Sequence, residues 1–345
     1  DNMLVSVTYP QTLGATAPKT NSGKMKVNGW EVALSWRDKI GDLNYFVSAN
    51  ISDAKNKIVA MENATTKNWN TRTSNLVGYA MNTYWGMEAV KLIETQEELD
   101  AYVKTVGNDV LNGATLRIGD MMYRDLDKDG TITKEDVKLL GDNTPHYSFG
   151  INLGAEYKGF DFSANIQGVG KQMIMRNASA ATMLVANSYQ NQGSVWYGKN
   201  WSDVADYYGN NYGISYIEND GTTTNTNLLL SSVNRNPNAV PKTTLNGNVR
   251  TYNYLYSDAW YRKQNGAYAR MKNITIGYTL PKSILAKFNI DKLRVYFSGN
   301  DLFEITKTKD GWDPEATAED PFGGTSGSNS YPFMRSYSFG IDLTF

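Results

Sequence analysis

Apolar and polar residues alternate strictly along several stretches of this chain. Over residues 147–157 every second residue is apolar or aromatic, and the residues between are small or polar. Lys158-Gly159 follows, and the alternation resumes over 160–166. A period of two is typical of β-strands with one apolar and one polar face, and the short link predicts a hairpin.

The same pattern recurs along the chain and predicts a set of long strands. These strands cover residues 30–36, 43–51, 147–157, 160–166, 274–280, 293–297 and 337–345. Many run about nine to eleven residues, which exceeds the usual strand of a soluble sheet and matches a tilted strand that crosses a bilayer. Aromatic residues near the strand ends are typical of the girdles at the two membrane interfaces.

The links between the predicted strands alternate between short and long. The short ones follow Arg37, Tyr157 and Leu280, whereas the long ones cover 53–145, 172–267 and 304–334. Outer-membrane barrels have short periplasmic turns and long external loops, and every short link falls on the periplasmic side if the C-terminus lies there. The pattern predicts an all-β protein, a transmembrane antiparallel β-barrel whose three long links are extracellular loops. The alternative is a large secreted two-sheet adhesin.

Composition narrows the function classes. The 345 residues carry a formal charge of −1, so no basic footprint points to nucleic acid. With no Cys and a single His, thiolate metal sites, cysteine nucleophiles and two-His metal sites are excluded. No GxSxG, Walker A or GxGxxG motif is present, and His146 lies at a strand start, where a structural role is expected. We therefore expect no enzyme.

Several motifs resemble one family of membrane transporters. The stretches concerned are GDMMYRDLDKDGTI (119–132), LGDNTP (140–145), YKGFD (157–161), YARMKNITIGYTLP (268–281), SGNDLF (298–303), DPE (313–315) and the terminal Phe345. In this order they resemble the SusC/RagA family of TonB-dependent outer-membrane transporters of Bacteroidetes. One departure is that Asn300 stands one place earlier than the family pattern has it.

The resemblance implies both an architecture and an activity. It implies that residues 1–345 are the C-terminal part of a barrel of about 22 strands, with the plug and the N-terminal strands absent. The barrel would pair with that remainder, lie in outer-membrane lipid, take energy from TonB and carry a SusD-like surface lipoprotein as a lid. The expected cargo is an oligosaccharide, and an oligopeptide is the alternative within the family. A secreted calcium-binding adhesin and a passive porin without a plug are the rivals from other classes.

The sharpest local motif is an acidic loop that resembles a calcium site. Carboxylates alternate at Asp125, Asp127 and Asp129, Gly130 permits the tight turn, and a further carboxylate closes the motif at position twelve. The expected ligands are Asp125, Asp127, Asp129, the carbonyl of Thr131, and Asp136. We expect calcium, or another hard cation, in a structural role within the first long loop; an acidic turn solvated without metal is the alternative.

Three further features lie in the long links and at the C-terminus. Thr95 to Glu98 form a capping box that predicts a short helix from Gln96 to about Lys104. Weak candidates for cargo contact are three rings of the second long link, Trp196, Tyr197 and Trp201, for which packing between loops is the alternative. The acidic cluster Asp313, Glu315, Glu319 and Asp320 is expected in a solvated loop, and contact with a partner or a ligand is the alternative.

The last strand also resembles a signal for membrane insertion. Its apolar face ends in an aromatic residue, as in the C-terminal segment read by the barrel-insertion machinery; an ordinary lipid-facing strand would show the same alternation. The residues concerned are Tyr337, Phe339, Ile341, Leu343 and Phe345.

Overall fold

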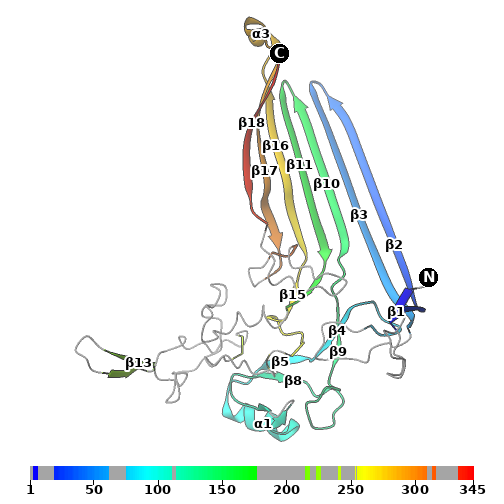
Figure 1. The fold of residues 1–345 in the computed structure, drawn as a ribbon, viewed down its shortest axis with the longest axis vertical. Helices are drawn as coiled ribbons and strands as arrows, with labels where there is room; N and C mark the ends of the chain where they lie inside the picture. Colours follow the sequence, from blue (N-terminus) through cyan, green and yellow to red (C-terminus); the bar gives the residue numbers. More distant parts are fainter. Residues whose placement is uncertain are drawn as a thin grey trace.

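A computed structural model shows a long antiparallel sheet with a small lobe at one end (Figure 1). It describes residues 3–6, 19–61, 75–110, 114–176, 214–217, 223–226, 240–241, 253, 255–308, 313–315 and 333–345. The sheet has eight strands in the order β1-β2-β3-β10-β11-β16-β17-β18. Their bounds are β1 (Met3–Ser6), β2 (Lys19–Ile40), β3 (Leu43–Met61), β10 (His146–Tyr157), β11 (Phe160–Lys171), β16 (Tyr268–Thr279), β17 (Lys292–Thr306) and β18 (Ser336–Thr344).

All the predicted strands are present, and the structure adds β1. Strand β3 continues to Met61, past the expected loop start at Asp53, and β2 begins at Lys19 rather than at Trp30. These extensions were not predicted because polar residues occupy both faces there, so the period of two is lost. The β-class prediction holds for the part of the chain that the structure describes.

Short turns join the strands at one end of the sheet. In the β10–β11 hairpin Tyr157 pairs with Phe160, and the two turn residues both have positive φ, 46° at Lys158 and 88° at Gly159. Two positive φ values are the signature of a type I′ turn, whose twist matches the flanking strands. The compact link between β16 and β17 contains α3 (Lys282–Leu285) and the 3₁₀ turn η4 (Ala286–Phe288), at the end where the C-terminus also lies (Figure 1).

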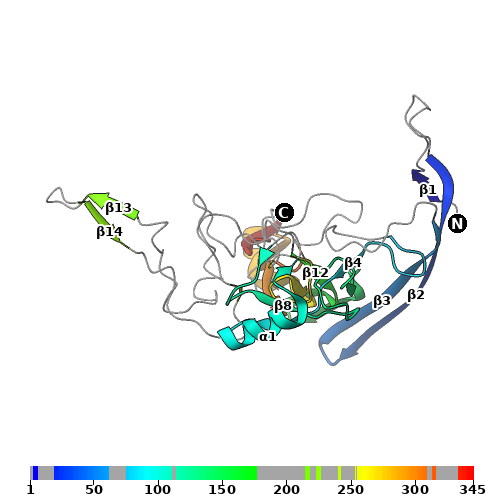
Figure 2. The ribbon, with the colours of Figure 1, turned by 90° about the horizontal axis from the view of Figure 1, so that it is seen from below.

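At the opposite end the two longest links fold together into a lobe. The lobe comprises residues 75–110, 114–142, 240–241, 253 and 255–262. Its elements are β4 (Thr83–Gly86), β5 (Ala89–Leu92), α1 (Gln96–Val106), β6 (Asp109–Val110), β7 (Ala114–Thr115), β8 (Met121–Tyr123) and β9 (Lys138–Asp142). Side by side with β9, the pair β12 (Met173–Met175) and β15 (Lys263–Asn265) leads back into the sheet. Away from the lobe lies the hairpin β13 (Ile214–Ile217) and β14 (Thr223–Thr226) (Figure 2).

The lobe has a hydrophobic core of its own, which takes residues from both links. Leu92, Ile93 and Val106 from the first link pack with Leu255 and Tyr261 from the second. The backbone also crosses between the links, since the N–H of Met87 donates to the carbonyl of Tyr256 at 2.7 Å. The capping box is confirmed: Thr95 accepts from the N–H of Glu98, and α1 starts at Gln96.

The sheet is open among the described residues. The order of pairing ends at β1 and β18, and the view along the strands shows these edges apart (Figure 2). Within the described residues the strands therefore form an open sheet that is not closed into a barrel. No described helix has the length and apolar character needed to cross a membrane.

Candidate functional site

One face of the sheet carries a continuous band of exposed apolar side chains. Register places Phe297 opposite Phe339 on one side and opposite Ile276 on the other, and Ile276 in turn faces Phe162. Phe339 is 83% exposed. Exposed rings and aliphatic side chains aligned across neighbouring strands fit a lipid-facing wall rather than the surface of a soluble protein.

The other face carries a belt of neutral hydrogen-bonding side chains. Hydrogen bonds cross the strands from Asn165 to Asn152 at 2.6 Å, from Asn273 to Asn300 at 2.8 Å and from Asn300 to Ser336 at 3.0 Å. The pairing register places five polar positions on this face, namely Asn44, Ser48, Asn152, Asn165 and Gln167. Such a face suits contact with water or with polar protein groups, not a dry core.

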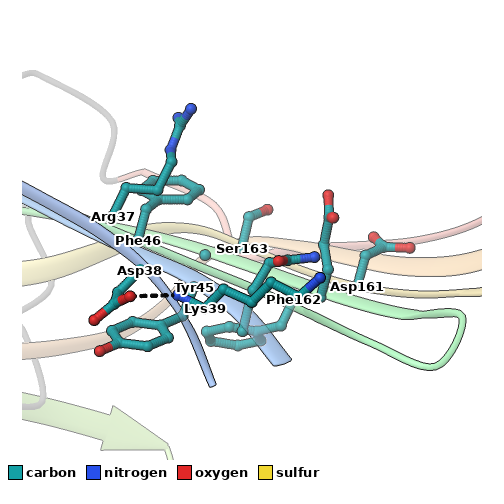
Figure 3. Close-up of a pocket in the computed structure, with 12 residues that line it drawn as sticks. Arg37, Asp38, Lys39, Tyr45, Phe46, Asp161, Phe162 and Ser163 are labelled. Carbon is teal, nitrogen blue, oxygen red and sulfur yellow. Dashed lines mark hydrogen bonds between the residues drawn. The ribbon is translucent and has the colours of Figure 1, made fainter. Parts of the chain in front are cut away.

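Near the short turns a cavity of about 660 Å³ lies between β2, β3, β10 and β11. Figure 3 shows Arg37 and Phe46 on the same side of the sheet as Ser163, and Tyr45 and Phe162 on the opposite side. The ring of Phe46 covers Gly154, where an added Cβ would lie 2.1 Å from Cε1 of the ring. Charged and aromatic side chains therefore occur on both sides of the sheet here, since Phe46 lies beside Arg37 and Asp38 lies on the side of Tyr45.

At the lobe end of the sheet a buried arginine gathers carboxylates. Arg270, 1% exposed, pairs with Glu304 through Nη2, with Asp313 at 2.7 Å and with Glu315 at 2.8 Å. The ring of Phe333 lies 5.2 Å from its guanidinium. The expectation of a solvated loop is therefore wrong for Asp313 and Glu315, because Arg270 on β16 compensates their charges and binds this loop to the sheet.

The acidic loop brings three of its four expected carboxylates together. Ligand oxygens of Asp125, Asp127 and Asp136 all lie within 4.8 Å of one another. Asp136 is fully buried and accepts hydrogen bonds from the N–H groups of Leu126 at 2.6 Å and Thr133 at 2.8 Å. Backbone N–H groups thus hold Asp136, the last residue of the loop, in place without an ion.

The fourth expected carboxylate is directed elsewhere. Asp129 Oδ1 accepts from both the N–H and the hydroxyl of Thr131, each at 2.8 Å. Asp129 is not part of the group formed by Asp125, Asp127 and Asp136. The backbone carbonyl of Thr131, the remaining expected ligand, stays a prediction.

Electrostatics differ between the two carboxylates that start the loop. Loss of solvent and repulsion from Asp136, Asp129 and Asp125 raise the pKa of Asp127. Loss of solvent acts in the same direction on Asp125, but hydrogen bonds from the N–H groups of Gly130 and Lys128 outweigh it and lower the pKa of Asp125. A bound cation would relieve the repulsion at Asp127.

The loop is anchored in the lobe core. Ile132, 2% exposed, and Val137, 7% exposed, flank its second half and pack among the buried residues of the lobe. The residues that could hold an ion are therefore coupled to the packing of both long links.

The other sites expected from the sequence divide into three groups. Exposure is high at all five positions of the proposed insertion signal, Tyr337, Phe339, Ile341, Leu343 and Phe345. Trp196, Tyr197 and Trp201, like Glu319 and Asp320 of the acidic cluster, lie outside the described residues. His146 takes the structural role expected of it, since its Nδ1 lies 2.6 Å from Oδ1 of Asp53 and joins the start of β10 to the interior of the neighbouring strand β3.

Comparisons with known proteins give relatives of one kind. No profile of a known protein family matches the chain. TonB-dependent receptor P3 of Formosa agariphila is 25% identical over the whole chain, and TonB-dependent receptor P26 of the same organism is 23% identical. The resemblance to TonB-dependent receptors is confirmed. The chain spans 31% of the length of P3 and 32% of the length of P26.

Solved structures agree in fold. A structure of the RagAB peptide transporter matches 99% of the chain with a TM-score of 0.60 and 21% identity. The RagAB peptide importer in its closed-closed state matches the whole chain with a TM-score of 0.62 and 22% identity. In both cases the match covers 32% of the neighbour's chain. The described sheet thus shares the fold of about a third of the RagAB chain.

Proposed function

We propose that this chain forms part of a TonB-dependent importer in the outer membrane of a Gram-negative bacterium of the Bacteroidetes. The observation that carries the proposal is the two-faced sheet: long strands with an exposed apolar band on one side and a polar hydrogen-bonded belt on the other. The similarity to TonB-dependent receptors over the whole chain supports it and speaks against the adhesin. The apolar band would contact lipid and the belt would face the plug and the lumen.

The proposed cargo is an oligomeric nutrient that a passive pore does not concentrate. The sequence predicts an oligosaccharide as cargo. Because the RagAB neighbour is named a peptide transporter, we include an oligopeptide as a second proposed cargo. The lobe and the loop bound by Arg270 lie at the end of the sheet opposite the short turns, where a SusD-like lipoprotein would sit as a lid. The rest of the barrel would pair with the free edges of β1 and β18.

We further propose that Asp125, Asp127 and Asp136 hold a calcium ion that stabilises the lobe. Their oxygens converge in the described structure, the donor set is hard oxygen, and the like charges repel without a cation. The role is structural, because the loop contributes Ile132 and Val137 to the lobe core.

Uptake by intact cells tests the importer. Cells that carry the complete receptor would be given labelled oligopeptides or oligosaccharides, with TonB present or deleted. TonB-dependent accumulation of one cargo class supports the proposal and names the class. Uptake that is the same without TonB would indicate a passive porin, and a receptor found in the soluble fraction would indicate the adhesin.

A further inference from the structure

A second cavity lies where the sheet meets the lobe, and we name it the mouth cavity. Its volume is about 580 Å³, within the range of about 300–1,000 Å³ typical of sites for small ligands. Three segments distant in sequence line it: the end of β9 with the start of β10, the end of β11 with β12, and the segment that contains β15. Unlike the cavity near the short turns, it lies at the end of the sheet away from α3 (Figure 1).

The mouth cavity contains two ammonium groups. Lys171 is exposed and pairs in register with His146; no hydrogen bond or ion pair engages its ammonium group within the described part of the chain. Lys263 donates to the carbonyl of Leu140 at 2.8 Å. Burial lowers the pKa of Lys263 and outweighs the attraction of Asp258, which raises it, while repulsion from Lys138 and Lys171 adds to the lowering. An anion between Lys171 and Lys263 would offset this repulsion.

Two carboxylates line the same cavity. Asp142 Oδ1 accepts from the N–H of Thr144 at 3.0 Å and lies 4.0 Å from Nε2 of His146, and the Asp142 side chain is 23% exposed. Asp258 pairs with Lys138 at 2.8 Å, so its charge is already compensated within the lobe. Asp142 therefore offers the carboxylate with more capacity to meet a cation, and the charge of the cavity is of both signs.

We propose that the mouth cavity binds a short zwitterionic peptide, with Lys171 and Lys263 facing its carboxylate and Asp142 facing its ammonium group. The mixed charge decides against an acidic oligosaccharide, because a chain of uronic acids carries a negative charge on every ring and would also meet Asp142 and Asp258. The amide of Gln172, 6% exposed, and the amide of Asn265 add donors and acceptors of the kind a peptide backbone uses. The proposal deepens the importer proposed above by naming the chemistry of a cargo subsite.

Calorimetric titration of the intact, detergent-purified receptor tests the subsite. The probe is tetraalanine, and the comparison probes are its N-acetyl form, its C-terminal amide and trigalacturonate. We expect tetraalanine to bind, Lys171→Gln to weaken it about tenfold, and Lys171→Arg to retain most of the affinity. The matched control is Lys158→Gln, an exposed lysine in the β10–β11 turn at the far end of the sheet, which should change nothing.

Comparison of each probe with each variant distinguishes a direct contact to the peptide from a general loss of binding. The amide form should bind weakly to the native receptor, and Lys171→Gln should weaken it no further. By the same reasoning, Asp142→Asn should affect tetraalanine and leave the N-acetyl form unchanged. Equal tetraalanine affinity in the native receptor and the Lys171→Gln variant would overturn the proposal, as would tighter binding of trigalacturonate than of tetraalanine.

Thermal unfolding of each variant shows whether a loss of binding reflects misfolding. If Lys171→Gln does not fold, the affinity of Lys171→Arg for tetraalanine still tests the proposal. The two proposals fail separately. Lys171-dependent binding without TonB-dependent uptake would count against the importer alone. TonB-dependent uptake without Lys171-dependent binding would count against the mouth cavity alone.

Discussion

Arg294 and Asp161 form a bidentate ion pair across an intervening strand. Nε of Arg294 on β17 donates to Oδ1 of Asp161 on β11 at 2.9 Å, and Nη2 donates to Oδ2 at 2.6 Å. Strand β16 lies between them, and the side chains meet over Gly277, where an added Cβ would lie 2.5 Å from Oδ1 of Asp161. Arg294 also donates to Asp342 on β18 at 3.0 Å. Its guanidinium therefore joins β11, β17 and β18, and it crosses β16 where Gly277 has no side chain.

A methyl group at Gly277 should therefore weaken the sheet. Gly277→Ala would displace the ion pair, whose side chains are 19% and 30% exposed. We expect the free energy of unfolding to fall by about 1–3 kcal/mol, a value between those typical of exposed and of buried ion pairs. The measurement is denaturant unfolding of the refolded receptor. Gly150→Ala is the matched control, because its Cβ meets only the flexible amide of Asn50. Equal losses in the two variants would count against the ion pair as the cause.

Removal of Arg270 should release the loop between β17 and β18. Arg270→Met leaves Glu315 paired with Lys272 but removes the arginine that compensates Asp313, and uncompensated buried charge costs about 3–5 kcal/mol. We expect faster protease cleavage within 307–335, mapped by mass spectrometry. Arg335→Gln, an exposed arginine at the end of the same loop, is the control; with chymotrypsin, which does not cleave at arginine, it should leave the cleavage rate unchanged.

Calcium should raise the unfolding temperature of the lobe through three carboxylates. Asp127→Asn and Asp136→Asn should abolish the rise in millimolar calcium, whereas Asp129→Asn should reduce it little, because Asp129 is turned toward Thr131. Differential scanning calorimetry with calcium or chelator measures the rise. Asp100→Asn on the exposed side of α1 is the control. A rise that survives Asp136→Asn would place the ion elsewhere.

The calcium effect should depend on pH with a defined sign. Since the pKa of Asp127 is raised, its charged form destabilises the loop at neutral pH, and this penalty disappears as pH falls through the raised pKa. Calcium offsets the penalty only while the carboxylate is charged. The calcium-dependent rise should thus be full near pH 7 and decline as pH falls through the raised pKa of Asp127. A rise that grew on acidification would contradict this reasoning.

Loss of the C-terminal aromatic should impair assembly. Deletion of Phe345, which is 82% exposed, removes the last residue of the proposed insertion signal and touches no described hydrogen bond of β18. We expect less receptor in the outer-membrane fraction and more degradation, measured by immunoblot. Phe345→Tyr should restore assembly. Normal assembly of the deletion variant would reduce this strand to an ordinary lipid-facing one.

Sequence periodicity predicts the strands well where one face must be apolar. It predicts β10 almost to its ends and the start of β11, because Tyr157 and Phe160 bracket a two-residue turn, but it misses the last five residues of β11. It fails where strands leave the apolar band, as in the polar extension of β3 to Met61. The spacing of the acidic loop predicts the convergence of Asp125, Asp127 and Asp136 but not the diversion of Asp129, because that depends on a local hydrogen bond to Thr131.

Contacts between distant segments lie beyond such patterns. Nothing in the DPE sequence shows that Asp313 meets Arg270, since the partners are brought together by the pairing of β16 with β17. The mouth cavity could not be predicted for the same reason, because Lys171 and Lys263 belong to separate segments that the pairing of β12 with β15 places side by side. The sequence signal for both features was a charged residue next to a strand end. Such residues are too common to predict a specific contact or cavity.

The shared core of the lobe sets a rule for exchanging parts between related receptors. Because Met87 bonds to Tyr256 and Leu92 packs in one core with Tyr261, a chimera that inherits only one of the two long links would bring mismatched halves together. The two links must be transplanted as a pair. Along the lineage they are then expected to diverge in concert, although more than a hundred positions of sequence separate their contacting residues.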